Sequence, residues 1–212
     1  MSQLALFAPD NAPAPEAQLR VPDDQAARLH AGDGDYRTEF ISPQEEQQLL
    51  AHVDAAPWLT TLRRRVQHYG YRYDYSQRHI SAESRLGDLP DWVEFVTHRL
   101  MQQDVFAIPP EQMIVNEYQP GQGIAPHSDS PCFGDTLASL SLGSACMMRV
   151  FPHRDSSPFD IVLAPRSLVI YRGTSRYQWR HAILARKSDT QNGQKFLRTR
   201  RVSLTFRTIA PQ

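Results

Sequence analysis

The sequence has few cysteines, few lysines and no long apolar run. Its two cysteines, Cys132 and Cys146, are too few for a disulfide framework and form no Cys-x-x-Cys pair, so we expect reduced thiols. No stretch approaches the roughly 18 consecutive apolar residues of a membrane span, and no basic start leads into an apolar segment. These absences exclude a secreted, fibrous or membrane protein and favour a cytoplasmic one.

The charges balance overall but are unevenly distributed. Residues 1–60 contain ten acidic residues against three arginines, whereas residues 166–212 contain eleven basic residues against one aspartate. Residues 63–85 add six arginines against two acids. Because nearly all the basic residues are arginine, they are suited to two-pronged binding of carboxylate or phosphate. Two interpretations stay open: solvated faces of an arginine-rich chain, or basic segments that flank a site for an anionic polymer.

The 212 residues fit one domain with an extension. Residues 1–35, rich in proline, alanine and acids, are expected to be a flexible tail, and residues 36–212 the domain. Ser42-Pro43-Gln-Glu45 predicts the start of a helix that runs to about residue 53. A second helix is predicted over 91–103, and a strand or hairpin over 62–75.

From residue 113 onward, the sequence predicts short strands that are separated by turns containing glycine or proline. The predicted strands are 113–118, 136–142, 145–151, 160–163, 167–171 and 200–208. A helical start followed by closely spaced strands predicts an α+β protein built on an antiparallel barrel or jelly roll.

The pattern His-x-Asp places two ligand side chains on one face of a strand. It occurs as His52-Val-Asp54, His127-Ser-Asp129 and His153-Arg-Asp155. The first copy lies at the end of a predicted helix, where residues two apart do not face each other, and the third lies in a predicted loop. His127 and Asp129 follow a turn between predicted strands, so we select them.

A third candidate ligand is His181, on the segment that begins at Tyr177. Two imidazoles and one carboxylate on one face of an octahedral metal leave three positions open, which is typical of non-haem Fe(II) oxygenases. The alternative is a set of ordinary surface histidines.

The segment 201–207 alternates strictly between a polar and an apolar face. The polar face carries Arg201, Ser203, Thr205 and Arg207. Two arginines on a central strand are costly unless something anionic meets them, and a dicarboxylate co-substrate is a good candidate. The alternative is an edge strand with exposed arginines.

Four separated motifs now stand in order: Asn116-Glu-Tyr118, His127-Ser-Asp129, His181 and Arg201-x-Ser-x-Thr-x-Arg207. In order and spacing they resemble the AlkB family of Fe(II)/2-oxoglutarate dioxygenases, over about residues 40–207. The runs 65–75 and 135–143 are most similar to the branch with the oxygenase domain of a tRNA-modifying homologue. The resemblance implies a double-stranded β-helix (jelly-roll) core with N-terminal helices packed on it and a nucleotide-recognition lid.

The resemblance also implies roles for individual residues. The three candidate ligands would bind Fe(II), with 2-oxoglutarate as co-substrate and O2 as oxidant. Arg201 would pair with the distal carboxylate of 2-oxoglutarate, which Asn116 and Tyr118 would also hydrogen-bond. Arg207 would lie near the other end of the co-substrate or near the substrate. Ser203 is also one of the implied co-substrate positions. The family has asparagine there, so this chain lacks one side-chain amide at the site.

The substrate is less defined. DNA-repair members of the family often place an acid two residues after the iron aspartate, where this chain has Pro131. Arg64, Arg65, Tyr71 and Tyr73 look like part of the family's lid, which would hold an unpaired or flipped base. Basic residues beside aromatics favour alkylated single-stranded DNA or RNA as the partner. The alternative is that the tyrosines fill a hydrophobic layer.

The tail contains the apolar pentapeptide Gln3-Leu-Ala-Leu-Phe7. It resembles the short peptides with which bacterial repair and replication proteins bind the DNA sliding clamp. The alternative is a chance apolar start.

The function expected from these features is oxidative dealkylation or hydroxylation of alkylated bases in nucleic acid, with DNA repair as the first choice. The same fold leaves open a tRNA or RNA hydroxylase and a hydroxylase of proteins or small molecules. A catalytically silent nucleic-acid-binding module would be marked by a broken set of metal ligands, and all three are present. Zinc hydrolysis with the same ligands would leave Arg201 unexplained.

Overall fold

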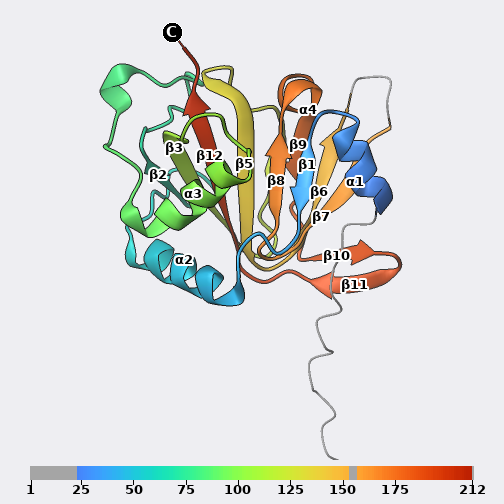
Figure 1. The fold of residues 1–212 in the computed structure, drawn as a ribbon. Coiled ribbons are helices and arrows are strands. Elements are labelled where there is room, and N and C mark those ends of the chain that lie inside the picture. Colours follow the sequence, from blue (N-terminus) through green and yellow to red (C-terminus); the bar gives the residue numbers. More distant parts are fainter. Residues whose placement is uncertain (1–22, 153–156, 212) are drawn as a thin grey trace, which may run out of the picture.

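Two antiparallel sheets face each other in the computed structural model, which describes residues 23–152 and 157–211. The larger sheet contains, in spatial order, β1 (Asp35–Arg37), β8 (Leu168–Tyr171), β5 (Phe133–Gly143), β12 (Arg201–Ile209), β3 (Gln112–Tyr118) and β2 (Val66–Tyr69). The smaller contains β4 (Ile124–His127), β9 (Arg180–Ile183), β6 (Cys146–Phe151) and β7 (Phe159–Leu163). A hairpin of β10 (Ser188–Gln191) and β11 (Gln194–Leu197) projects from one end (Figure 1). The predicted α+β class is confirmed.

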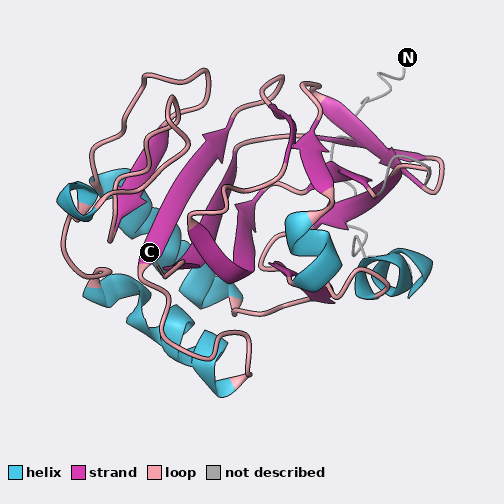
Figure 2. Cartoon of the chain, turned by 90° about the horizontal axis from the view of Figure 1, so that it is seen from above, coloured by secondary structure: helices cyan, strands magenta, loops and turns pink. Residues whose placement is uncertain are grey.

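Helices cover the outer face of the larger sheet (Figures 1 and 2). They are α2 (Pro43–Ala55) and α3 (Glu94–Gln102), the latter preceded by a 3-10 turn at Asp91–Val93. The predicted capping box is present: the Glu45 backbone N–H donates to Ser42 Oγ, and the Ser42 N–H donates to the Glu45 carboxylate. No described helix has both the length and the apolar character needed to cross a bilayer.

Strand β12 separates the helix-facing core from the interior between the sheets. Val202, Leu204 and Phe206 are fully buried in the cluster that includes the apolar sides of α2 and α3. The alternate residues of the strand point the other way, toward the smaller sheet. Because β12 pairs with both β5 and β3, it is a central strand, and the alternative of an exposed edge strand is wrong.

The folded part begins earlier than the boundary expected at residue 35. Residues Asp23–His30 form α1, with acids in its first turn and Arg28 and His30 in its last, as the helix dipole favours. Leu29 is fully buried in the cluster between the sheets. The burial of this one leucine side chain therefore anchors α1 to the domain, although the composition of the segment suggested a flexible tail. The pentapeptide 3–7 lies outside the described residues.

The predicted strand over 62–75 is reduced to β2. It ends because Gly70 has φ +76°, and a Cβ there would lie 1.8 Å from the Glu111 carbonyl oxygen. Residues 71–85, which we call the lid loop, then form an irregular hairpin with isolated bridges between Tyr71 and Arg85 and between Asp74 and His79. A 3-10 turn at Ala82–Ser84 lies within it.

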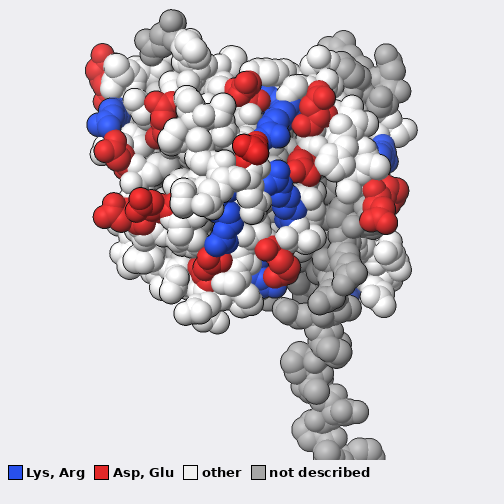
Figure 3. Space-filling model, in the orientation of Figure 1, with Lys and Arg blue, Asp and Glu red and all other residues white. Residues whose placement is uncertain are grey.

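The uneven charge distribution is partly explained by pairing inside the fold. Arg166 binds Glu39 and Glu46, and Arg200 binds Asp54, so acidic residues before position 60 meet basic residues after position 165. On the face shown in Figure 3, acidic and basic side chains are interspersed. These arginines therefore serve the fold and do not form a surface for an anionic polymer.

Candidate metal centre and its cavity

The pairing of β4 with β9 brings two histidines together. His127 ends β4 and is the direct register partner of His181 in β9, and their ring centroids are 4.5 Å apart. Gly123 permits this approach because a Cβ at that position would lie 2.1 Å from the Ile183 carbonyl oxygen. The close contact of these two strands thus places both imidazoles at one point.

Asp129 completes the cluster just after β4. Ligand atoms of His127, Asp129 and His181 all lie within 4.8 Å of one another, and His181 Nε2 is 3.9 Å from Asp129 Oδ2. This is the one such group of at least three His, Cys, Asp or Glu among residues 23–152 and 157–211. The three predicted ligands therefore converge with the donor set of a facial triad.

The electrostatics keep the triad in the form that binds a cation. Burial alone would raise the pKa of Asp129, but Arg207, His181 and His127 outweigh it and lower that pKa. Burial lowers the pKa of His181 to about 4, so its imidazole is neutral near pH 7. His127 Nδ1 lies 2.8 Å from the Ala125 carbonyl oxygen, to which it donates as N–H, and this leaves Nε2 free to bind metal.

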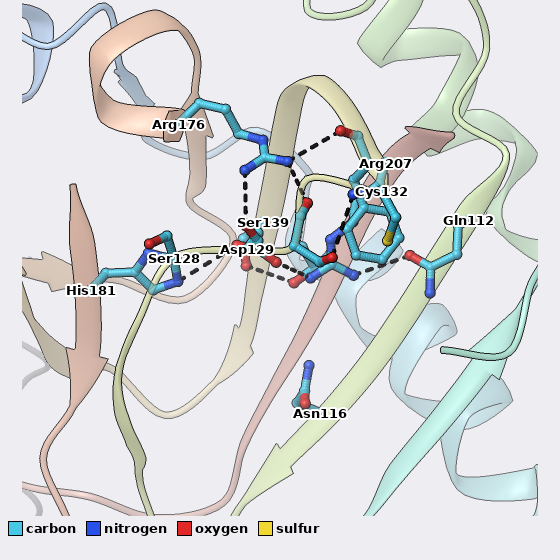
Figure 4. Close-up of polar contacts among 12 residues, drawn as sticks. Gln112, Asn116, Ser128, Asp129, Cys132, Ser139, Arg176, His181 and Arg207 are labelled. Carbon is cyan, nitrogen blue, oxygen red and sulfur yellow. Dashed lines mark hydrogen bonds and ion pairs between the residues drawn. The ribbon is translucent and has the colours of Figure 1, made fainter. Parts of the chain in front are cut away.

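Two arginines fix the third ligand. Arg207 Nη2 donates to Asp129 Oδ1 at 2.6 Å (Figure 4). Arg176, on α4 (Gly173–Tyr177), donates to four backbone carbonyls between residues 129 and 134. The loop that carries the aspartate is therefore held from inside, although it belongs to no strand.

The first His-x-Asp pair, His52 and Asp54, makes other contacts. His52 stacks on Trp92 at 5.5 Å between ring centroids, and Asp54 forms an ion pair with Arg200. Residues 153–156 lie outside the described part of the chain. The structure brings His127 and Asp129 together with His181, and their role as metal ligands stays a prediction.

Arg201 is a buried cation with unused donors. It is 3% exposed, its Nη2 donates to Ser141 Oγ at 2.8 Å, and its guanidinium lies over the ring of Tyr118. Its Nε and Nη1 are buried without a hydrogen-bond partner in the described chain. Unpaired buried guanidinium atoms are costly. A carboxylate placed against them would accept both bonds, which fits the distal end of 2-oxoglutarate.

The triad and Arg201 line one cavity of about 240 Å³ between the sheets. Predicted co-substrate positions that also line it are Asn116, Tyr118, Ser203 and Arg207. Of the predicted lid residues, Arg64 and Tyr73 line it, and Arg64 Nε donates to Asn116 Oδ1 at 2.9 Å. The cavity is therefore lined by the three candidate metal ligands, the buried arginine and part of the lid.

Two predicted substrate residues lie away from this cavity. Arg65 forms a two-pronged pair with the buried Glu117 and stacks over Trp58. Tyr71 packs at the edge of the cluster between the sheets. Along β3, the Glu117 side chain points to the opposite side of the sheet from those of Asn116 and Tyr118. Its partner Arg65 is therefore also directed away from the cavity.

The structure adds two lid residues that sequence reasoning missed. Tyr75 lines the cavity, with its ring 5.0 Å from that of Tyr73. Arg78 also lines it and donates to the Ser128 carbonyl oxygen beside the triad. The alternation of tyrosines at 71, 73 and 75 was a visible signal for Tyr75, whereas nothing in the sequence marked Arg78.

Comparison with known proteins agrees with this geometry. The family described as the 2OG-Fe(II) oxygenase superfamily matches residues 38–207. An Arabidopsis thaliana protein named alkylated DNA repair protein ALKBH8 homolog is 36% identical over 195 residues, which cover 81% of this chain and 56% of that protein. An uncharacterized protein of Acanthamoeba polyphaga mimivirus is 31% identical, covering 81% of this chain and 82% of its own length.

A third relative is the Xenopus tropicalis protein named tRNA (carboxymethyluridine(34)-5-O)-methyltransferase alkbh8, which is 34% identical. The match covers 81% of this chain but 31% of that protein, so the chain spans about half or less of the length of the Arabidopsis and Xenopus relatives. The solved structure of OsALKBH1 has a TM-score of 0.61 at 18% identity, covering 82% of this chain and 96% of that one, which supports the shared fold.

The chain belongs to the 2OG-Fe(II) oxygenase superfamily, and its relatives place it among the AlkB homologues. This confirms the resemblance to AlkB proteins, the enzyme class, and Fe(II), 2-oxoglutarate and O2 as the groups it uses. It also agrees with the jelly-roll core.

Proposed function

We propose that this protein oxidises alkyl groups on bases of single-stranded nucleic acid. The observation that carries the proposal is the shared cavity, which joins a complete metal triad, a buried arginine with unused donors and the aromatic and basic lid loop. Relatives are named as an alkylated DNA repair protein and as a probable RNA/DNA demethylase, which supports a nucleic-acid substrate. Repair of alkylated DNA is our first candidate.

Residues of this chain would bind and orient both substrates. Arg201 would hold one carboxylate of 2-oxoglutarate, and His127, Asp129 and His181 would hold the metal. When bound, Fe(II) and 2-oxoglutarate supply the oxidation of a C–H bond by O2, with release of succinate and CO2. An N-methyl group oxidised to N-hydroxymethyl then loses formaldehyde and leaves the free base nitrogen.

The lid loop would present the base. Tyr73 and Tyr75 offer ring faces and edges at the mouth of the cavity, and Arg64 lies over Tyr75. Arg78 ties the loop to the Ser128 carbonyl oxygen, next to the metal ligands. A flipped base stacked among these rings would be shielded from water and brought near the metal.

Hydroxylation of a tRNA base is the second candidate. Vertebrate relatives at 34–37% identity are named as tRNA methyltransferases, although this chain covers only 24–31% of their length. The cavity serves either reaction, because both begin with oxidation of a C–H bond on a base held by the lid.

The test is a substrate panel with matched variants. The protein is loaded anaerobically with Fe(II) and 2-oxoglutarate, mixed with methylated and etheno-modified DNA and RNA oligonucleotides, and exposed to air. We expect succinate in amounts equal to the formaldehyde released from methylated bases and to the glyoxal released from etheno-modified bases, together with a loss of mass from the modified base. Succinate without any change in the oligonucleotides would contradict the proposed substrate class.

Binding should also weaken with salt if the lid arginines contact phosphates. For single strands the logarithm of the affinity falls with the logarithm of salt by about 0.7 per phosphate neutralised. Fluorescence anisotropy of a labelled oligonucleotide at several salt concentrations measures this slope. A slope near zero would remove phosphate contacts from the proposal.

A further inference from the structure

Four polar side chains, two of them buried and two half-buried, lie at the end of the cavity where the lid loop, β2, β3 and β12 come together. They are His68, Tyr75, Gln112 and Arg207, which we call the donor corner. Tyr75 and Arg207 line the cavity. The His68 ring contacts that of Tyr75 at 5.7 Å between centroids, and Arg207 Nη1 donates to Gln112 Oε1 at 3.0 Å (Figure 4). The charge of Arg207 acts on both His68 and Tyr75, so the two pairs lie near each other.

Each member keeps one buried polar atom without a partner in the part of the chain that the structure describes. These atoms are His68 Nε2, Tyr75 OH, Gln112 Nε2 and Arg207 Nε. A native protein leaves few buried polar atoms unpaired, so four in one place, beside a cavity, call for a ligand. The atoms of Arg201 at the opposite end are accounted for by the co-substrate carboxylate.

All four atoms can donate. His68 Nδ1 accepts from the Tyr73 backbone N–H, so the neutral imidazole carries its proton on Nε2. Because Gln112 Oε1 accepts from Arg207, the unpaired atom of Gln112 is its amide nitrogen. Arg207 Nε is a donor only, and the Tyr75 hydroxyl can donate. A matching ligand must therefore present oxygen or nitrogen acceptors.

The charges around the cavity also favour a ligand that presents acceptor atoms. Four arginines line it: Arg64, Arg78, Arg201 and Arg207. The single carboxylate in the lining, Asp129, is a metal ligand already paired with Arg207. The lining therefore offers no free carboxylate to a cationic base.

We propose that the donor corner selects bases with carbonyl acceptors, so that neutral alkylated lactam bases are preferred over cationic alkylated amino bases. This rests on the proposed function and names its substrate class. 3-Methylthymine and 3-methyluracil are neutral and flank the methylated nitrogen with two carbonyl oxygens. 1-Methyladenine and 3-methylcytosine are cationic and carry an exocyclic amine. The amine is a hydrogen-bond donor and could not accept from the donor corner, and the positive charge of the base would be repelled by the arginines.

The corner is shielded from solvent, so a base reaches it by displacing Tyr75. That side chain lies on the lid loop and is held by ring contacts rather than by a strand ladder. Its hydroxyl would then bond to the base instead of staying unpaired.

The test measures binding and oxidation separately. Short oligothymidylates with one of the four methylated bases are titrated by fluorescence anisotropy into protein loaded with Mn(II) and 2-oxoglutarate, which does not turn over. The same oligonucleotides are then oxidised by the Fe(II) form. We expect both affinity and kcat/KM to favour the lactam bases by about 10- to 100-fold, the range for two or three specific hydrogen bonds.

Two variants probe the corner directly. Tyr75→Phe removes one donor and should reduce the lactam preference several-fold. Gln112→Glu exchanges the amide nitrogen for an acceptor and adds negative charge, so the preference should shift toward the amino bases. Tyr69→Phe is the matched control, because its hydroxyl is bonded to Gln67 and its ring packs on the helix side of the sheet. The control should keep the wild-type preference.

The outcomes separate the two proposals. Lactam-selective binding without oxidation of any oligonucleotide would support the donor corner and overturn the proposed reaction. Oxidation of amino bases as fast as lactam bases, or a Gln112→Glu variant with unchanged selectivity, would overturn the donor corner and leave the reaction standing.

Discussion

The unpaired guanidinium of Arg201 makes an unusual prediction about stability. Replacing a buried arginine normally destabilises a protein, but here two of its nitrogen atoms lack partners among the described residues. Arg201→Met removes the buried charge and keeps a side chain of similar length. The removed penalty is about 1–3 kcal/mol, less about 1 kcal/mol for the lost bond to Ser141. The free energy of unfolding of the ligand-free protein should therefore rise by up to about 2 kcal/mol.

The effect of 2-oxoglutarate should change in the opposite direction. A ligand at 100 times its Kd stabilises the folded protein by about 2.7 kcal/mol. In a chain of 150–250 residues each kcal/mol shifts Tm by about 2–4 °C. The wild-type protein should gain roughly 5–10 °C with 2-oxoglutarate and Mn(II) over Mn(II) alone. Without ligand, Arg201→Met should have a Tm up to about 8 °C higher than the wild-type protein, and 2-oxoglutarate should raise it by almost nothing.

Arg198→Met is the matched control. Arg198 is also buried, but it binds both oxygens of the buried Asp189 and the Leu184 carbonyl oxygen, so all its groups are used. Its loss leaves the buried Asp189 with only the Met147 N–H and a 3.7 Å contact to Arg186, and should cost about 3–5 kcal/mol. Thermal unfolding of both variants, with and without 2-oxoglutarate, measures the contrast. If Arg201→Met lowered the ligand-free Tm as Arg198→Met does, or kept the 2-oxoglutarate response, the assignment of Arg201 would be refuted.

Three further predictions follow from the triad and its supports. His127→Ala should abolish succinate formation and tight Mn(II) binding, measured by mass spectrometry and calorimetry; undiminished succinate would remove His127 from the metal. Burial lowers the pKa values of His68 and His181 from 6.5 to about 4, so the unfolded chain binds more protons in that range. The free energy of unfolding of the metal-free protein should fall by up to about 3 kcal/mol per histidine as the pH falls from about 6.5 to 4. A midpoint of urea unfolding that does not change over this pH range would contradict this prediction. Gly123→Ala should weaken metal binding at least tenfold, because the Cβ of the alanine would force β4 away from β9. An unchanged Kd for the metal would show that the close approach of the two strands is not needed for binding.

The sequence was informative wherever local chemistry decided the structure. The capping box at Ser42 fixed the start of α2, and the alternation over 201–207 placed two arginines on the inner face of β12. The choice among three His-x-Asp pairs also depended on local context, since a turn between strands suits a metal site better than a helix end does.

The lid could not be derived in the same way. Period-two alternation predicts facing side chains in a strand, but Gly70 ends β2 and the chain continues as an irregular hairpin. Tyr71 therefore lies away from the cavity while Tyr73 and Tyr75 reach it. Arg65 looked like its neighbour Arg64, and only the tertiary fold shows that the buried Glu117 binds it. Partners distant in sequence decided these roles.

The cavity carries more positive charge and more unpaired donors than its own residues can satisfy. Arg201 has two unused nitrogen atoms at one end, the donor corner has four unused atoms at the other, and the triad lines the same cavity. Arg207 belongs to both halves, since it binds Asp129 and Gln112. A site arranged in this way gives up stability when empty and regains it from ligands at both ends. A base bound at Gln112 and Arg207 would therefore act on the same guanidinium that positions the metal's aspartate, which links recognition of the base to the geometry of the metal centre.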